Sequence, residues 1–483
     1  MSGFKRLFSL ATKGRPTAQT LSYAMADPAS ASGRGSLPRR FPRSQPAAPA
    51  GRIDGQASGE CQIGGHNIAY ALQVGFCPLG AGRMRIGVRG WALDRKSFVP
   101  VATLVCRIAG QSEIRLAPEQ LRGDIMNHFK LPVETRKFAR NCGFETVLEA
   151  DLGEGVPEIS LALEVGDVRH EIGKGHPGTA QFIEGLHGWL FLAGDSNDSP
   201  AQFTQAHQPS DSWVADWNRY FAAFTAMRDD WPKMRASFLV APSKESVMPD
   251  YYPLPHGGQT PLDSLLDRFG EDPDVHYPLD ILVPLRELSF DRIETHWSDF
   301  GARKVCEALL ENWKRGIPNI PDRYHVIRTG GDLGFKAVPL HLSYRTKAAW
   351  PEDSRVIFDN FVLHHGRVRI SHNPKPKIKA TVALFGGSSS EHMECYFRAV
   401  FERVVYVYSA GAWDPEILTQ EKPDYVVLQT SERFLTRAPE PVVLTREVVH
   451  KKVSGGYVTR KTDRAEAMAG FDDPSVAFYH EMG

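Results

Sequence analysis

Apolar and polar residues alternate through much of the segment 59–173. Every second position is apolar in 84–88, 102–108 and 159–165, which is typical of a strand that buries one face. Glycine and proline residues separate these runs and indicate turns. The pattern therefore predicts an antiparallel β-sandwich domain over 59–173.

After residue 174 the pattern changes to short, continuous apolar runs that alternate with amphipathic helical segments. The expected strands are 189–192, 237–241, 280–283, 381–385, 404–408 and 425–429, and the clearest expected helices are 211–228 and 299–314. Continuous apolar strands that alternate with helices predict an α/β domain with a mostly parallel sheet and flanking helices. In such domains the reactive groups lie at the carboxyl ends of the strands.

The two ends of the chain have a different composition. Residues 1–58 are rich in Ser, Ala, Pro, Gly and Arg and contain only two acids, Asp27 and Asp54, so we expect a disordered basic tail. A basic arm that contacts an acidic partner or a membrane surface is the alternative. The end of the chain has an irregular pattern. The expected division is 1–58, 59–173, 174–445 and 446–483, the last being a C-terminal tail.

Composition narrows the possible functions. A chain of 483 residues with 42% hydrophobic residues is long enough for more than one domain. Its 57 basic and 57 acidic residues cancel, so no long-range field favours nucleic acid as a partner. The six cysteines show neither CxxC nor CxH spacing, which predicts reduced thiols and no zinc site. No phosphate-binding glycine loop is found, and we expect no cofactor.

The sequence shows no segment typical of membrane insertion or export. No run approaches 18 apolar residues, so we expect no transmembrane segment. Lys5 and Arg6 precede an apolar run that is too short for a signal peptide. These observations predict a cytoplasmic location.

A candidate nucleophile follows the apolar run that ends at Phe385. The pair Gly386-Gly387 permits a sharp turn before Ser388, and the helix expected next would direct free backbone N–H groups towards a developing oxyanion. The alternative is that Ser388 and Glu391 form a capping box and that Ser388 only caps this helix. Ser389 and Ser390 are the second choices for a nucleophile.

A candidate base precedes the helix expected at 299–314, which Ser298 or Asp299 would cap. His296 follows Glu294 by two positions, and in an extended segment these two side chains point the same way. A carboxylate there would hold the imidazole in the tautomer that accepts a serine proton. The alternative is a structural histidine without a chemical role.

Five blocks carry a resemblance to a known family. They are Gly185-Leu-His-Gly188-Trp-Leu-Phe-Leu192, Pro242-Ser-Lys244-Glu245, Glu294-Thr-His296-Trp297, Phe385-Gly-Gly-Ser388, and Pro423-Asp-Tyr-Val426 with Glu432-Arg433. In this order they resemble the SGNH-hydrolase-like domain of the alginate O-acetyltransferase family, of the AlgX/AlgJ type, over residues 175 to about 440. The sequence departs from the family pattern at Glu294 and Gly387, where the family has aspartate.

The resemblance implies an SGNH-hydrolase-like fold and O-acetylation of a polysaccharide or oligosaccharide through an acyl-enzyme. By matching position, Ser388 is the expected nucleophile, His296 the general base and then acid, and Glu294 the orienting carboxylate. The acetyl donor is not identified. Two alternatives are a carbohydrate esterase of the same fold and a catalytically silent sugar-binding scaffold of polysaccharide biosynthesis. Because the family acts in the periplasm, that compartment is the alternative location.

Overall fold

The computed structural model describes residues 51–54, 56–80, 83–151, 157–176, 181–337, 341–349, 351–460 and 463–482. Most of the segment expected to be a disordered basic tail, 1–58, lies outside the described residues. The strands β1 (Gly51–Asp54) and β2 (Gln56–Ile63) occupy its last part.

Two sheets form from the segment with period-two alternation. The four-stranded antiparallel sheet has the order β2-β3-β4-β7, with β3 at His66–Gly80, β4 at Arg83–Asp94 and β7 at Gly143–Asp151. The five-stranded sheet has the order β1-β9-β8-β5-β6, with β5 at Thr103–Ile108, β6 at Ile114–Leu116, β8 at Ile159–Val165 and β9 at Val168–His176. Short helices α2 (Gly123–His128) and α3 (Val133–Ala139) precede β7.

The alternation places one side of each strand in a shared hydrophobic core. Ile86 and Val88 from β4 lie in the same core as Leu104 from β5 and Leu161 from β8, and all four are almost fully buried. The expected strands at 84–88, 102–108 and 159–165 are therefore confirmed, with β5 beginning one residue later.

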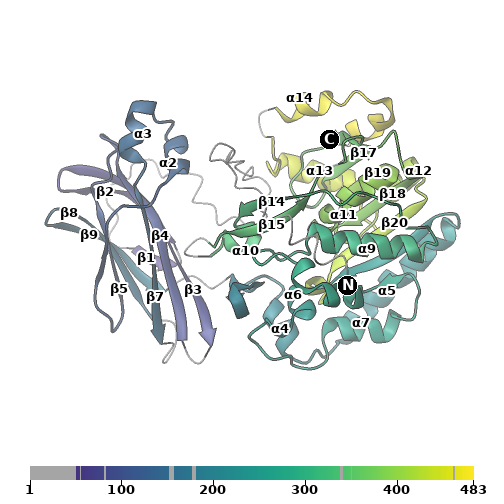
Figure 1. The fold of residues 1–483 in the computed structure, drawn as a ribbon, viewed down its shortest axis with the longest axis horizontal. Helices are drawn as coiled ribbons and strands as arrows, with labels where there is room; N and C mark the ends of the chain where they lie inside the picture. Colours follow the sequence, from purple (N-terminus) through teal and green to yellow (C-terminus); the bar gives the residue numbers. More distant parts are fainter. Residues whose placement is uncertain are drawn as a thin grey trace, which may run out of the picture. The chain divides into compact units, whose positions relative to one another are not determined.

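The rest of the chain is built around a mixed seven-stranded sheet of order β13-β12-β20-β18-β19-β17-β16 (Figure 1). Its strands are β12 (Arg235–Ala241), β13 (Val275–His276), β16 (Arg355–Asp359), β17 (Val368–His372), β18 (Ile378–Gly386), β19 (Phe401–Tyr408) and β20 (Tyr425–Ser431). Neighbours from β13 to β19 run parallel, whereas β17 is antiparallel to both β19 and β16. The expectation of a mostly parallel sheet in an α/β domain is confirmed at this level.

Helices cover both faces of this sheet because successive strand residues face opposite sides. Along β18, Val382 and Leu384 belong to a core that includes α9 (Asp299–Asn312) and α11 (Ser388–Val400). Ala383 and Phe385 belong to a second core that includes α5 (Asp211–Asp230) and α7 (Pro261–Phe269). Figure 1 shows α9 and α11 beside each other, as their contacts require.

Two expected strands differ from the structure. The run 280–283 is helical, because it covers most of α8 (Leu279–Leu282) and the first residue of the 3-10 helix η3 (Val283–Leu288), and so the strand prediction was wrong. Its brevity made the apolar pattern ambiguous, and the turn lies between Pro278 and Pro284. Residues 189–192 do form a strand, β11 (Leu190–Leu192), but it pairs with β10 (Phe182–Glu184) in a separate two-stranded sheet.

Several elements were not anticipated from the sequence. The antiparallel pair β14 (Tyr324–Thr329) and β15 (Ser343–Ala348) lacks a clear apolar alternation, and most residues of both strands are exposed or only partly buried. The shorter helices are α4 (Ser199–Thr204), α6 (Lys244–Val247), α10 (Gly331–Gly334) and α12 (Pro415–Glu421).

The last part of the chain is more regular than its pattern suggested. It contains α13 (Thr445–Ser454), α14 (Arg464–Ala469) and α15 (Ala477–His480). Val476 and Tyr479 are fully buried in the second core of the seven-stranded sheet. These residues help to cover that face of the sheet.

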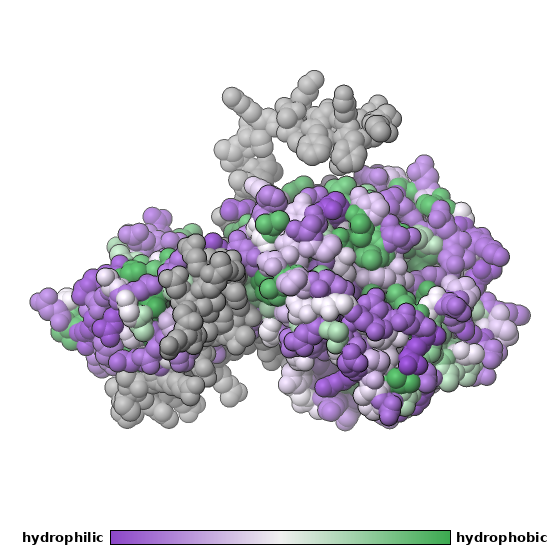
Figure 2. Space-filling view, turned by 90° about the horizontal axis from the view of Figure 1, so that it is seen from below, coloured by the Kyte–Doolittle hydropathy of each residue, from purple (hydrophilic) through white to green (hydrophobic). Residues whose placement is uncertain are grey.

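The helices and one face of the surface can be compared with the expected absence of a transmembrane segment. Within the described ranges, every helix is too short or too polar to span a bilayer. Figure 2 shows a face on which hydrophilic residues predominate and apolar residues are interspersed among them. The five cysteines with described side chains are free and buried.

Candidate functional site

The candidate site begins at the carboxyl end of β18. The strand ends at Gly386, and α11 starts two residues later at Ser388. A side chain at 386 is impossible without rearrangement, because a Cβ there would lie 2.0 Å from Ser390 Oγ. The turn is held from both sides: Gly387 N–H donates to Gln429 Oε1 at 2.9 Å, and Tyr406 Oη–H donates to the Gly387 carbonyl at 3.0 Å. Strands β19 and β20 thus fix the position of Ser388.

The hydroxyl of Ser388 does not cap the helix. The N-cap position belongs to Gly387, and no side chain caps this helix end. Ser388 Oγ instead lies 2.6 Å from His296 Nε2, although the two residues are 92 positions apart. The capping alternative was therefore wrong. Of the second choices, Ser390 donates its hydroxyl to Gln429 at 2.8 Å and Ser389 is buried.

The histidine is held by the carboxylate expected from the sequence. His296 Nδ1 lies 2.8 Å from Glu294 Oε1, and both side chains are more than nine-tenths buried. Trp297 Nε1–H donates to the Ser389 carbonyl at 2.9 Å and ties this loop to the start of α11. Ser298 accepts from Gly301 N–H and caps α9, as one of the two expected caps.

A buried arginine supports the carboxylate. Arg345 of β15 donates Nη1–H to Glu294 Oε2 at 2.5 Å and Nε–H to Asp291 Oδ2 at 2.8 Å. Burial alone would raise the pKa of Glu294, but the charge of Arg345 and the hydrogen bond from His296 bring it well below its ordinary value. Glu294 is therefore ionised, so His296 carries its proton on Nδ1 and presents Nε2 as an acceptor to Ser388.

A third acid lies next to this group. Asp332 accepts from Thr295 N–H at 2.8 Å and also from the Thr295 hydroxyl. Burial, together with the charge of Glu294, raises the pKa of Asp332 to about 6. One ligand atom each from Glu294, His296 and Asp332 lie within 4.8 Å of one another, a spacing that suits a metal ion. Both His296 nitrogens and both Glu294 oxygens are already engaged in hydrogen bonds, which favours a hydrogen-bond network over a metal site.

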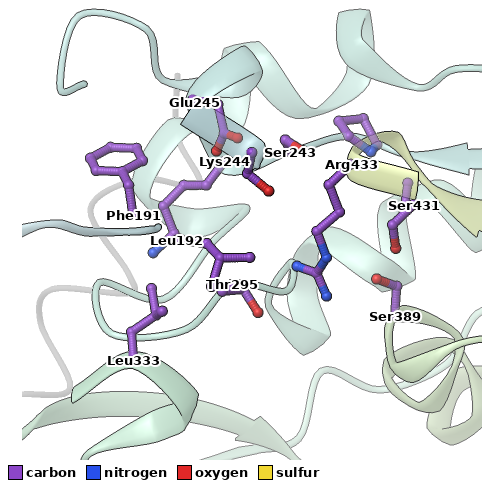
Figure 3. Close-up of a pocket in the computed structure, with 13 residues that line it drawn as sticks. Phe191, Leu192, Ser243, Lys244, Glu245, Thr295, Leu333, Ser389, Ser431 and Arg433 are labelled. Atoms are coloured by element: carbon purple, nitrogen blue, oxygen red, sulfur yellow. The ribbon is translucent and has the colours of Figure 1, made fainter. Parts of the chain in front are cut away.

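A hollow lined by both polar and apolar residues adjoins this group (Figure 3). Thr295 and Ser389, the chain neighbours of His296 and Ser388, line it together with Glu245 and Arg433. Figure 3 shows the Arg433 guanidinium pointing into the hollow between Thr295 and Ser389. Lys244 is turned to the protein instead, because its ammonium donates to the carbonyls of Leu190 at 2.8 Å and Asp291 at 2.9 Å.

The Glu245 carboxyl predicts a pH dependence of stability. Burial and the nearby Glu432 raise its pKa to about 7, from an ordinary 4.5. Folding therefore favours the protonated form, and this group destabilises the fold progressively as pH rises from 4.5 to about 7. Glu245→Gln, which stays neutral, should be up to about 3 kcal/mol more stable than wild type at pH 8 and about equal to it at pH 5. Urea unfolding at both pH values measures the difference.

The control for this experiment is Glu271→Gln, which changes an exposed carboxylate on the loop after α7. It should leave the difference in unfolding free energy between pH 5 and pH 8 as in wild type. An equal pH dependence in Glu245→Gln and wild type would contradict the burial argument.

Sequence reasoning found Ser388, His296 and Glu294 but not the groups around them. Arg345 gave no signal, because it lies in a strand without apolar alternation. Tyr408 ends β19, so the rule that reactive groups follow strand ends could have selected it. Burial raises the pKa of Tyr408, and hydrogen bonding with the side chain and backbone of Ser388 opposes this rise. Its phenol thus lies beside Ser388.

Solved structures similar to this chain were found, whereas two other comparisons with known proteins gave no match. No protein-family model matches the chain, and no curated protein matches it. Bacillus cereus PatB1 is similar at 10% identity and a TM-score of 0.38, over 51% of this chain and 94% of that chain, and the same protein with a sulfonyl adduct gives equal values. The O-acetyltransferase domain of Pseudomonas putida AlgJ is similar at 16% identity and a TM-score of 0.34, over 54% and 93%.

An AlgJ domain is thus among the structures similar to this chain, and the sequence blocks resemble the same AlgX/AlgJ type. The TM-scores of 0.34 and 0.38 are low, so the likeness establishes neither the fold nor an activity of this chain.

Proposed function

We propose that this protein is a carbohydrate O-acetyltransferase that works through an acetyl-enzyme. Ser388 is the nucleophile, His296 the general base and then acid, and Glu294 the orienting carboxylate. One observation carries the proposal: Ser388 Oγ is 2.6 Å from His296 Nε2, whose Nδ1 is 2.8 Å from an ionised Glu294. Nucleophile, base and orienting acid at hydrogen-bond distance are the arrangement that acyl transfer requires.

The first half-reaction loads the enzyme. His296 Nε2 takes the Ser388 hydroxyl proton while Oγ attacks the acetyl carbonyl carbon of the donor. The bond between this carbon and the donor oxygen or sulfur then breaks, and the leaving group takes the proton from His296. An acetyl ester on Ser388 remains.

The second half-reaction delivers the acetyl group. A sugar hydroxyl gives its proton to His296 Nε2 as its oxygen attacks the ester carbon. The bond to Ser388 Oγ breaks, and Oγ recovers the proton from His296. In both halves an imidazolium forms next to Glu294, and the buried negative charge stabilises it.

Two features around Ser388 support stabilisation of the oxyanion. Ser388 is the first residue of α11, and the N-terminal end of a helix carries partial positive charge. The guanidinium of Arg433 adds positive charge in the adjoining hollow. Preorganised donors of this kind lower the barrier where the negative charge develops.

The glutamate that replaces the family's aspartate does not weaken the proposal. Glu294 Oε1 reaches His296 at hydrogen-bond distance, while its second oxygen is held by Arg345. At Gly387 an added Cβ would meet only Gln429 Oε1, at 3.8 Å, and the turn is held through backbone atoms, because the Gly387 N–H binds Gln429 and its carbonyl accepts from Tyr406. A silent sugar-binding scaffold has no need for this alignment.

The proposal extends to the architecture. We infer an SGNH-hydrolase-like arrangement for 174–445, a β-sandwich for 59–173, and a C-terminal tail for 446–483 that closes one face of the sheet. The seven-stranded sheet with the candidate site at its carboxyl edge, and the core that the two preceding sheets share, support this division. The acceptor is a polysaccharide or an oligosaccharide.

Covalent labelling tests the proposal. Phenylmethylsulfonyl fluoride should modify the wild type once, on Ser388, and His296→Ala should abolish the modification because the hydroxyl then lacks its base. Mass spectrometry of peptides locates the adduct. Labelling elsewhere, or equal labelling of His296→Ala, would remove the basis of the proposal.

Product analysis then separates transferase from esterase, because a transferase moves acetyl from p-nitrophenyl acetate to an oligosaccharide and an esterase releases acetate only.

A further inference from the structure

A second histidine–carboxylate pair lies beside the first. His392 Nδ1 is 2.6 Å from Asp299 Oδ1, and its ring is 5.8 Å from the His296 ring at an interplanar angle of 26°. The two imidazoles are therefore nearly parallel, and the Nδ1 of each lies at hydrogen-bond distance from a buried carboxylate. The arrangement repeats that of His296 and Glu294.

The second pair is built on elements next to the first, because His392 lies on α11 with Ser388 and Asp299 begins α9 directly after the loop of Glu294 and His296. His392 lies four residues after Ser388 on α11, so both side chains occupy one face of that helix. Asp299 is the first residue of α9, shortly after the loop of His296. On β15, Arg345 and Lys347 are two positions apart and therefore face the same side. Arg345 binds Glu294, and Lys347 Nζ lies 3.4 Å from Asp299 Oδ1.

The His392 imidazole has one nitrogen, Nε2, that makes no hydrogen bond within the described residues. His296 uses both nitrogens, for Glu294 and for Ser388. His392 makes one hydrogen bond within the described part of the chain, through Nδ1, and its Nε2 lies on the opposite side of the ring from Asp299. Burial, with the charge of Lys347, lowers the pKa of His392 against the opposing effect of Asp299. The ring is thus neutral near pH 7, and Nε2 is an acceptor.

We propose that His392 Nε2 accepts a hydrogen bond from a hydroxyl group of the acceptor sugar and so directs the acetyl group to sugar rather than to water. This inference rests on the proposed function and adds an acceptor-binding residue to it. A sugar carries neighbouring hydroxyls, and two parallel imidazoles can engage two of them at once. Water offers a single oxygen and gains nothing from the second imidazole.

The chemistry of the transfer step is unchanged by this contact. The reacting hydroxyl gives its proton to His296 Nε2, its oxygen bonds to the acetyl carbon, and the bond to Ser388 Oγ breaks. The neighbouring hydroxyl keeps its proton and donates a hydrogen bond to His392. His392 therefore contributes to acceptor affinity and orientation, and loading of Ser388 does not need it.

The test separates loading from transfer. His392→Phe keeps a planar ring but removes the acceptor nitrogen, and Asp299 retains Lys347 and the Ala348 N–H at 2.8 Å. His392→Gln keeps an acceptor oxygen. Each protein is mixed with p-nitrophenyl acetate, and the nitrophenolate burst reports loading. Maltohexaose and a mannuronate hexasaccharide serve as acceptors, and mass spectrometry compares acetylated sugar with free acetate.

We expect the burst of His392→Phe to stay within about threefold of wild type, while its ratio of transferred to hydrolysed acetyl falls at least about tenfold and the KM for the sugar rises. His392→Gln should have a ratio of transferred to hydrolysed acetyl between those of His392→Phe and wild type, because its side chain keeps an acceptor oxygen. An unchanged ratio in His392→Phe overturns the inference. Loss of the burst with unchanged thermal unfolding overturns it as well, because His392 would then act on the Ser388–His296 pair.

The inference and the proposed function fail in different ways. A wild type that gives a burst but acetylates neither hexasaccharide overturns the role of His392 and leaves the acetyl-enzyme intact. A wild type without a burst and without labelling at Ser388 overturns the proposed function itself.

Discussion

Ser388→Ala is expected to lower acetyl transfer by a factor of about 10³ or more. The hydroxyl that lies 2.6 Å from His296 is the only group of the triad that would bond to the acetyl carbon, so its removal abolishes the acetyl-enzyme. Thermal stability should change little, because Ser388 is half-buried and does not cap α11. Acetyl transfer from p-nitrophenyl acetate to an oligosaccharide measures the effect.

Ser389→Ala is the matched control, one residue along the same helix turn. Its backbone carbonyl, which accepts from Trp297, remains after the substitution. Most of the transfer activity should therefore remain. If Ser388→Ala kept more than about a tenth of wild-type transfer, another nucleophile would have to be sought.

Arg345→Met is expected to have the largest effect on stability. The substitution leaves Asp291 and Glu294 buried without their shared cation, which typically costs about 3–5 kcal/mol. Urea unfolding at pH 7 measures this loss. Activity should fall too, because Glu294 then orients His296 less firmly.

The loss of unfolding free energy in Arg345→Met should depend on pH in a defined direction. In the wild type Arg345 holds the pKa of Glu294 below its ordinary 4.5, so this pairing stabilises the fold above pH 4.5 and its contribution is lost as pH falls through the lower folded pKa. The difference in unfolding free energy between wild type and Arg345→Met should therefore become smaller as pH falls. Arg345→Lys, which keeps the charge but not the two-pronged geometry, should lie between them. A gap that widens in acid would contradict the assigned charges.

The sequence selected Ser388 and the pair His296 and Glu294 as candidates for local reasons. Two glycines after an apolar run mark a strand that ends in a tight turn, and Ser388 follows them directly. His296 and Glu294 are two positions apart, so their pairing depends on the local path of the chain. The alternation at 84–88 and the apolar runs at 381–385 and 425–429 predicted strands equally well. A strand that buries one face has alternating apolar residues, and a strand that buries both faces has a continuous apolar run.

The partners of these residues could not be predicted in the same way. Arg345 is the only buried residue of the short strand β15, and the run at 280–283 became helical, since short segments carry too few residues to establish a period. His392 and Asp299 are 93 positions apart, and nothing in their own neighbourhoods indicates a pair.

By itself, therefore, the sequence determined where the strands alternate with helices and which serine, histidine and glutamate stand in suitable local settings, because these properties depend on neighbours along the chain. The tertiary structure alone decided that Ser388 meets His296, that Arg345 neutralises Glu294, and that His392 lies parallel to His296. These contacts depend on how α9, α11 and β15 pack against one another, and packing is a property of the whole fold.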